Sequence, residues 1–192
     1  MKVLLLSPYP EKLETTIKDS GDEVISYCKK INEEFLSTNN IEFLVSYGYR
    51  YKLNSSLLKL IDYKAINLHL SYLPFNKGAY PNLWSHIDNT PSGVTIHLMD
   101  DDLDTGKILS QKKVFIDKYT NTFKTSYFIL TEEIERLFSL NWDYFRENQS
   151  HGIVQKGRGT FHTIKDSKSV IKYLERGWDT NINEFLEFYK NK

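Results

Sequence analysis

The chain has 192 residues, of which 40% are hydrophobic and 26% charged, and its 25 basic and 25 acidic side chains give a formal net charge of zero. This composition is typical of a single soluble domain with a core of its own. A neutral chain lacks the surplus of Lys and Arg that binding to a nucleic-acid backbone requires, so no nucleic-acid partner is expected. The only cysteine, Cys28, cannot form an intrachain disulfide, which suits a cytoplasmic protein.

Taken in chain order, apolar runs and turn residues predict alternating strands and helices. Strands are expected at 2–7, 22–27, 41–49, 65–71, 92–100 and 107–116. Helices are expected at 12–21, 55–62 and 81–88, with a longer one inside 121–147. The first apolar run is too short for a signal peptide or a membrane span, so no membrane partner is expected. The alternation predicts an α/β fold, a Rossmann-like, mostly parallel sheet with helices on both faces.

The composition changes after Ser150, where Gly, Lys and Ser become frequent. Two short helical stretches follow, near 167–175 and 182–190. We therefore predict a main domain over 1–150 and a short C-terminal extension over 151–192.

The fourth expected strand, "AINLHLS" (65–71), carries Asn67, His69 and Ser71 on one face. Ligands of parallel sheets bind beyond the carboxyl ends of the strands, so these side chains stand where a site is expected. A single histidine on a strand is nevertheless more often structural than catalytic. The "NKG" that follows is, by itself, typical of a turn.

A second polar cluster lies in "GVTIHLMDDDLDTGKIL", where His97 sits inside a strand. Four acids follow it, Asp100, Asp101, Asp102 and Asp104. If the two strands are neighbours, Asp104 can return to His69, fix its tautomer and favour its protonated form, which raises its pKa. Asn67 would offer an amide to a developing oxyanion. Alone, the acidic run is typical of a solvated loop, and it lacks clear metal-ligand spacing.

Together, "NLHLSYLPFNKG" and "GVTIHLMDDDLDTGKIL" resemble the formyltransferase family that uses N10-formyltetrahydrofolate. The match spans residues 40–116. The family's motif positions are filled one by one, by Asn67, His69, His97 and Asp104. The resemblance implies that Asn67, His69 and Asp104 are catalytic and that Ser71 and His97 support them. It also makes 1–150 the formyltransferase catalytic domain.

The resemblance also implies a folate site without a metal. The stretch "VSYGYR" (45–50) resembles the folate-side strand of these enzymes. The folate-binding residues implied by the resemblance are Tyr47, Gly48, Leu98, Met99, Asp100 and Asp102. The formyl donor, N10-formyltetrahydrofolate, is then the co-substrate.

Departures from the family pattern favour one branch. The first strand is followed by "SPYPEKL", without the Gly-rich phosphate loop of phosphoribosylglycinamide formyltransferases. A basic tRNA-binding domain and the N-terminal regulatory domain of formyltetrahydrofolate hydrolases are not expected either. The stretches "GAYPNLW" and "QKGRGTFHTIKD" look like the sugar N-formyltransferases. This resemblance implies formylation of a dTDP- or UDP-linked amino dideoxy sugar, as in lipopolysaccharide O-antigen biosynthesis.

The sugar nucleotide would contact residues before and after the catalytic motif. The substrate-binding residues implied by the resemblance are Tyr9, Asn76, Lys77, Gly78, Tyr80, Trp84 and His162. Packing of its own helix explains Trp84 equally well, and a surface loop explains His162.

Two other functions and the oligomeric state stay open at this point. The first is a hydrolase of formyltetrahydrofolate, or a formyltransferase for another small amine. The second is a non-catalytic protein that binds folate or a sugar nucleotide. A homodimer is also left open.

Overall fold

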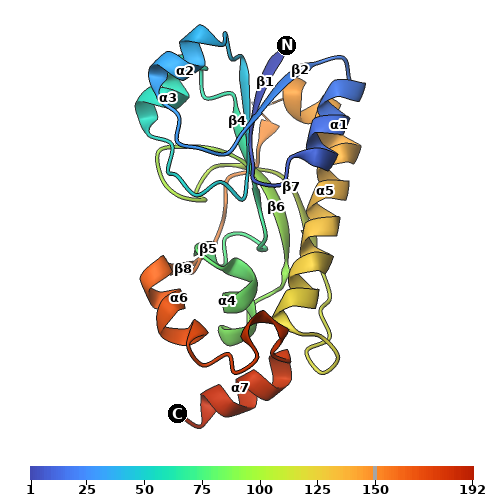
Figure 1. Cartoon of the computed structure of the whole chain (residues 1–192), viewed down its shortest axis with the longest axis vertical. Helices are drawn as coiled ribbons and strands as arrows, with labels where there is room; N and C mark the ends of the chain where they lie inside the picture. Colours follow the sequence, from blue (N-terminus) through green and yellow to red (C-terminus); the bar gives the residue numbers. More distant parts are fainter. Residues whose placement is uncertain (149–150) are drawn as a thin grey trace. The chain divides into compact units, whose positions relative to one another are not determined.

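The computed structural model of the protein describes residues 1–148 and 151–192 (Figure 1). Its strands are β1 (Lys2–Leu6), β2 (Glu23–Tyr27), β3 (Phe43–Tyr47), β4 (Ala65–His69), β5 (Lys77–Gly78), β6 (Gly93–Leu98), β7 (Ile108–Lys113) and β8 (Phe161–His162). Its helices are α1 (Glu11–Asp19), α2 (Glu33–Thr38), α3 (Ser55–Leu60), α4 (Pro81–Ile87), α5 (Phe123–Glu147), α6 (Ile164–Ile171), the 3-10 helix η2 (Gly177–Asp179) and α7 (Ile182–Lys190). The six expected strands and the expected helices are all present.

Six of the strands form one sheet in the order β2-β1-β3-β4-β6-β7. The pairs β1–β2, β1–β3 and β3–β4 are parallel. This mostly parallel α/β sheet confirms the predicted fold class. It also makes β4 and β6, the strands that carry Asn67, His69 and His97, direct neighbours.

The chain divides into two compact units. The first unit comprises Met1–His69, Ile96–Ser110 and Ile134–Gln155. The second comprises Leu70–Thr95, Gln111–Glu133 and Lys156–Lys192. The predicted domain boundary after Ser150 falls at residues 149 and 150, which lie outside the described residues, and it stays a prediction.

In the first unit, alternate residues of β1 and β3 pack on opposite faces of the sheet. One face joins Leu4 and Leu44 to the apolar side chains of α2 and α3 in a single buried cluster. On the other face Phe43 meets Trp142 of α5 edge to face, with ring centroids 5.3 Å apart. Figure 1 shows α2 and α3 on one side of these strands and α1 and α5 on the other. Both faces are covered, so β1 and β3 are mostly apolar, with Lys2 and Ser46 as the exceptions.

The second unit has its own core and a sheet that was not predicted. Its core cluster consists of Leu83, Trp84, Phe123, Val170, Leu174, Ile182 and Phe185. Lys77 and Gly78 form β5, which pairs in parallel with Phe161 and His162 of β8. The turn expected at "NKG" is therefore wrong at these two residues. A two-residue strand shows no periodicity, and its partner is remote in sequence.

Gly78 is required where β5 meets β8. Its φ is +85°, in the region that favours glycine. A Cβ on this residue would lie 2.4 Å from the carbonyl oxygen of His162. The glycine thus permits the close approach of the two strands.

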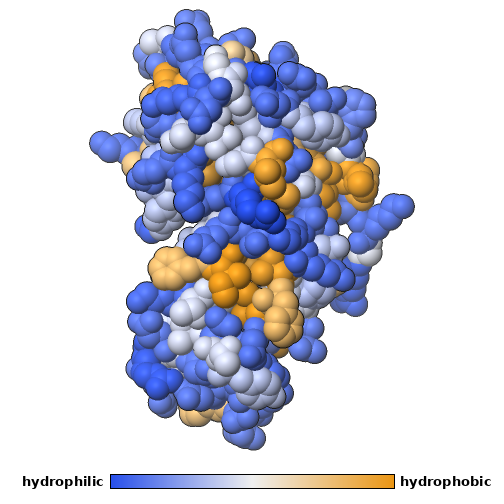
Figure 2. All heavy atoms as spheres, turned by 90° about the vertical axis from the view of Figure 1, so that its right-hand side faces the viewer, coloured by the Kyte–Doolittle hydropathy of each residue, from blue (hydrophilic) through white to orange (hydrophobic). Residues whose placement is uncertain are grey.

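Hydrophilic residues cover most of the face drawn in Figure 2, with hydrophobic groups between them. Long helix α5 contributes exposed hydrophobic side chains, among them Phe128 at 55% and Leu140 at 69% exposure. Among the residues that the structure describes, no helix is long and apolar enough to cross a membrane.

Candidate active site

The predicted catalytic residues of the first unit meet at the end of β4. Asn67 and His69 are two residues apart on this strand, and His97 lies on the neighbouring β6. The loop after β6 returns Asp104 to them. Asn67 Nδ2 lies 3.1 Å from Asp104 Oδ1 and 3.2 Å from His97 Nε2. The expected return of Asp104 depends on β4 and β6 being neighbours, and in the structure they are.

The Asp104 carboxylate faces both histidines. Its Oδ2 lies 3.6 Å from His69 Nδ1, and its Oδ1 lies 3.3 Å from His97 Nε2. The side chains of His69 and Asp104 are only 8% and 10% exposed. In such a low-polarity setting, a carboxylate interacts with a nearby imidazole more strongly than it does in water.

His97 is oriented by its own strand. Its Nδ1 lies 2.7 Å from the backbone carbonyl of Leu98. A carbonyl only accepts, so Nδ1 donates to it, and the hydrogen bond with the Asn67 amide nitrogen uses Nε2 as the acceptor. The second N–H of the Asn67 amide points to Asp104. His97 and Asp104 together orient the Asn67 amide, and the supporting role of His97 in catalysis stays a prediction.

Local backbone geometry brings Asp104 back toward the sheet. Its φ is +56°, a left-handed conformation that is uncommon outside glycine. Two residues later, a Cβ on Gly106 would lie 1.8 Å from the carbonyl oxygen of Leu98. Only glycine permits this approach of the loop to β6, where Leu98 N also donates to Lys107 O.

The other acids of this loop have different partners. Asp100 accepts a 2.6 Å hydrogen bond from the Thr105 hydroxyl, and Asp101 accepts one of 3.1 Å from Tyr63. Hydrogen bonds, chiefly from Ser55 and then from Tyr63, lower the pKa of the exposed Asp101 carboxyl. These contacts differ from those of Asp104, although the four acids look alike in the sequence.

Gln155 was not predicted as a site residue, although its amide contacts the backbone of the same loop. Its Nε2 lies 2.9 Å from Asp104 O and 2.9 Å from Gly106 O. No local pattern marks this residue, because its partners are 51 and 49 positions away.

The predicted folate residues lie in the first unit. Tyr47 is 2% exposed, and its hydroxyl donates to Glu135 at 3.1 Å. Gly48 ends the strand at φ +66°. Met99 packs against the apolar cluster on the α2 and α3 face, and Leu98, Asp100 and Asp102 belong to the segment that follows His97. The predicted substrate residue Tyr9, half exposed, meets Tyr47 edge to face at 6.4 Å.

The other predicted substrate residues lie in the second unit, four of them around His162. His162 Nε2 is 2.7 Å from Asp88 Oδ2, and its ring stacks on Trp84 at a centroid distance of 3.7 Å. Trp84 is 8% exposed and donates to Ser167. Asn76 is fully buried and donates to Asp88 at 3.3 Å. Lys77 and Gly78 lie on the paired strands β5 and β8.

Tyr80, the remaining predicted residue of this unit, is 41% exposed. Its ring stacks on that of Trp178, with centroids 5.7 Å apart and an angle of 22° between the planes. Trp178 was not predicted, since it follows the extension's first helix in a segment without a motif.

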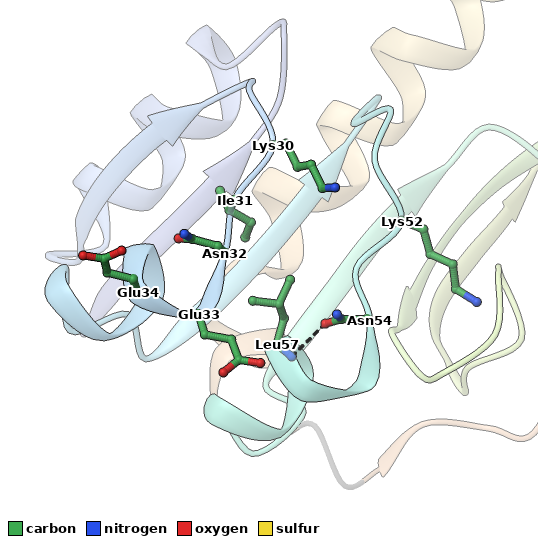
Figure 3. Close-up of a pocket in the computed structure, with 8 residues that line it drawn as sticks. All are labelled: Lys30, Ile31, Asn32, Glu33, Glu34, Lys52, Asn54 and Leu57. Atoms are coloured by element: carbon green, nitrogen blue, oxygen red, sulfur yellow. Dashed lines mark hydrogen bonds between the residues drawn. The ribbon is translucent and has the colours of Figure 1, made fainter.

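Two hollows are lined by other residues. One of about 520 Å³ lies in the first unit, between 30–34 and 52–57 (Figure 3). Asn54 in its wall accepts the backbone N–H of Leu57, as Figure 3 shows, and so caps α3. Both Lys30 and Glu33 line it, so its charge is mixed.

The second hollow, of about 1020 Å³, lies in the second unit, between α4, 114–119 and α7. His86 is part of its wall. Burial, and to a lesser degree the charge of Lys118, lowers the pKa of His86 to about 4. His86 is therefore neutral near pH 7. Neither hollow includes Asn67, His69 or Asp104.

Among residues 1–148 and 151–192, no group of three or more His, Cys, Asp or Glu side chains has an arrangement that could hold a metal ion.

The fold and the amide–histidine–carboxylate cluster have counterparts in known proteins. Residues 20–138 match the model of the formyl transferase family, and since this is more than half of the chain, the chain belongs to that family. The family resemblance inferred from the two motifs is thus confirmed. The members of this family are enzymes that catalyse formyl transfer.

Among solved structures, the chain is similar to the formyltransferase PseJ from Anoxybacillus kamchatkensis, with a TM-score of 0.89 and 41% identity over 97% of both chains. That protein was crystallised with UDP-4,6-dideoxy-4-formamido-L-AltNAc and tetrahydrofolate. A 4-N formyltransferase from Francisella tularensis shares the fold at 21% identity and a TM-score of 0.76, covering 88% of this chain and 79% of that one.

Relatives found by sequence match a shorter part of this chain. A dTDP-4-amino-4,6-dideoxyglucose formyltransferase of Mycobacterium bovis is 31% identical over 122 residues, which are 62% of this chain and 51% of that protein. A methionyl-tRNA formyltransferase of Lachnospira eligens is 41% identical over 85 residues, which are 44% of this chain and 27% of that protein. The chain therefore spans between about a quarter and a half of the length of these two relatives.

Proposed function

We propose that this protein transfers the formyl group of N10-formyltetrahydrofolate to the 4-amino group of a UDP-linked 4-amino-4,6-dideoxy sugar. The observation that carries the proposal is the 41% identity to PseJ over 97% of both chains, in a complex that holds a formylated UDP-sugar and tetrahydrofolate. A dTDP-linked amino sugar is the second candidate, because of the similarity to the mycobacterial enzyme.

The chemistry requires a base, an oxyanion donor and a charge that stabilises the protonated base. The neutral amine attacks the formyl carbon and forms the new carbon–nitrogen bond, which gives a tetrahedral oxyanion. His69 takes the proton that the amine nitrogen loses, and Asp104 stabilises the imidazolium. Asn67 and His69 stabilise the oxyanion. The bond from the formyl carbon to N10 then breaks, and N10 receives the proton from His69.

Folate binding is assigned to the first unit. Tyr47 and Gly48 end β3 next to the catalytic strand, since β3 and β4 are neighbours. Leu98, Met99, Asp100 and Asp102 follow His97. A glycine with positive φ lets a flat ligand approach the backbone closely, which supports Gly48 as a pterin contact.

Sugar-nucleotide binding is assigned to Tyr9 and to the second-unit residues. Lys77 supplies positive charge and His162 an imidazole for the diphosphate, and Tyr80 supplies an exposed ring for the base or sugar. Asn76 and Trp84 are buried, so they act by holding Asp88 and His162. Gly78 acts through the close pairing of β5 with β8.

Two finer expectations belong to the same proposal. We assign the reaction to the cytoplasm and retain a homodimer as the oligomeric state to be tested by light scattering.

The deciding experiment is incubation with N10-formyltetrahydrofolate and a UDP-4-amino-4,6-dideoxy sugar, followed by mass spectrometry of the sugar nucleotide. A mass gain of one formyl group is expected. The matched reaction without acceptor tests for a hydrolase, because formate released at the same rate without the amine would overturn the transferase function. Binding of both ligands without any turnover would identify a binding protein instead.

A further inference from the structure

We propose that Gln155 is a positioning residue for Asp104, and this inference rests on the proposed formyl transfer. Its amide nitrogen donates one N–H to the backbone carbonyl of Asp104 and the other to that of Gly106, both at 2.9 Å. The two hydrogen bonds span the turn that brings the Asp104 carboxylate to the catalytic cluster.

The turn needs an external donor because of its shape. Asp104 has a left-handed backbone, and Gly106 lies against the Leu98 carbonyl. Asp104 is half-buried and Gly106 is buried, and buried backbone carbonyls are as a rule hydrogen-bonded. A glutamine amide is suited to this task, since one nitrogen carries two N–H groups that match two carbonyls.

The segment that carries Gln155 is held next to the loop. Two residues earlier, Ile153 forms an antiparallel bridge with Ile108, in which both N–H to O distances are 2.8 Å. A Cβ on Gly152 would lie 2.6 Å from Cβ of Lys107, so the two backbones approach closely. The bridge thus fixes the backbone from which the Gln155 side chain extends.

The orientation of the Gln155 amide is determined by its partners. If the amide were turned over, Oε1 would face two carbonyl oxygens, which are acceptors only. In the observed orientation Oε1 is buried and has no hydrogen-bond partner among the described residues. The side chain is therefore held through its donors.

The consequence for catalysis follows from the distances around Asp104. Asp104 lies 3.1 Å from the Asn67 amide, but 3.6 Å from His69, beyond hydrogen-bonding distance. A small displacement of the turn changes the charge interaction with His69. Loss of the two Gln155 hydrogen bonds should therefore lower kcat and shift the acid limb of the kcat profile to lower pH. The KM for the sugar nucleotide should change little.

The test uses Gln155→Met, which keeps the length of the side chain and removes both donors, together with Gln155→Asn, which keeps the donors one methylene shorter. Gln111→Met is the matched control. Gln111 Nε2 also donates to two acceptors, Leu73 O at 2.7 Å and Thr95 Oγ1 at 2.9 Å, but these belong to the second unit. The same loss of two N–H donors is thus tested once in each unit.

For Gln155→Met we expect a fall in kcat on the order of 10-fold or more and an acid limb about one pH unit lower, with a smaller change for Gln155→Asn. Gln111→Met should leave the acid limb in place. In an Asp104→Asn background, Gln155→Met should add little, because residues that act as one unit are not additive.

An additive loss in the double variant, or an acid limb that stays in place in Gln155→Met, would overturn the positioning role. The His69 imidazole can also be titrated by NMR, assigned by the signal lost in His69→Ala. Should Gln155→Met not fold, Gln155→Asn carries the same comparison. An inactive wild type overturns the proposed function, whereas an active wild type with unaffected Gln155 variants overturns only this inference.

Discussion

Asp104→Asn should remove most of the catalytic activity while leaving substrate binding nearly unchanged. The two side chains have nearly the same shape, so the loop from Asp100 to Gly106 should keep its backbone. What disappears is one negative charge beside His69, whose Nδ1 lies 3.6 Å from Asp104 Oδ2. A carboxylate stabilises the imidazolium, so its loss lowers the pKa of His69 and makes it a weaker base.

The distance sets the size of this effect. Two unit charges 3.6 Å apart attract by about 4.6 kcal/mol at an effective dielectric constant of about 20. This attraction favours the imidazolium form, so its loss lowers the pKa of His69. Loss of effective general base catalysis typically lowers kcat by about 100-fold or more. The acid limb of the kcat profile should shift to lower pH, because His69 must be neutral to accept a proton.

The assay compares four variants, Asp100→Asn, Asp101→Asn, Asp102→Asn and Asp104→Asn, in kcat and in KM for each substrate. Asp100 and Asp101 accept from Thr105 and Tyr63, and an amide oxygen can accept these bonds too. We expect kcat to fall strongly only for Asp104→Asn, and folate contacts of Asp100 and Asp102 to appear in KM. Equal losses of kcat at all four positions would refute the assignment of Asp104 and indicate a diffuse acidic or metal-binding loop.

Three further predictions concern the neighbours of Asp104, the ligand and His86. Asn67→Ala and His69→Ala should each abolish transfer and retain the wild-type circular dichroism spectrum; a fully active or an unfolded variant would contradict their catalytic role. Calorimetry should detect binding of a UDP- or dTDP-linked amino sugar but not of tRNA, because the chain carries no net positive charge; tight, salt-sensitive tRNA binding would reject the sugar branch. His86 has a folded-state pKa of about 4 against an ordinary 6.5, so the unfolded state binds more protons between these values, and stability falls as the pH drops through this window. At pH 4 the free energy of unfolding should be about 3 kcal/mol lower than at neutral pH. His86→Gln should flatten the pH dependence of thermal unfolding between pH 4 and 6.5. An unchanged slope would show that His86 is not buried in its neutral form.

The sequence was most informative where structure depends on neighbours in the chain. The apolar runs of β1 and β3 indicate strands because both faces of the sheet are covered. Asn67, His69 and His97 are recognisable because alternation along a strand defines which side chains share a face. The parallel sheet and the family were predictable from these local patterns.

Long-range hydrogen bonds were not predictable in this way. Gln155 contacts a loop about 50 positions earlier, and β5 pairs with a strand that follows α5. His162 and Asp88 are 74 positions apart, and no motif joins them. Each of these contacts depends on how the extension packs after the main helix, which neither periodicity nor composition reports.

The Asn67 amide donates to Asp104 and is also the donor proposed for the oxyanion. In the structure its two N–H groups are matched by two acceptors, Asp104 Oδ1 and His97 Nε2. Stabilising an oxyanion therefore requires that one of them be released. In the proposed mechanism, proton transfer to His69 gives an imidazolium beside Asp104. We expect this charge to draw the carboxylate away from Asn67 and to free an N–H as negative charge develops on the formyl oxygen. Protonation of the base and completion of the oxyanion site then depend on the same carboxylate.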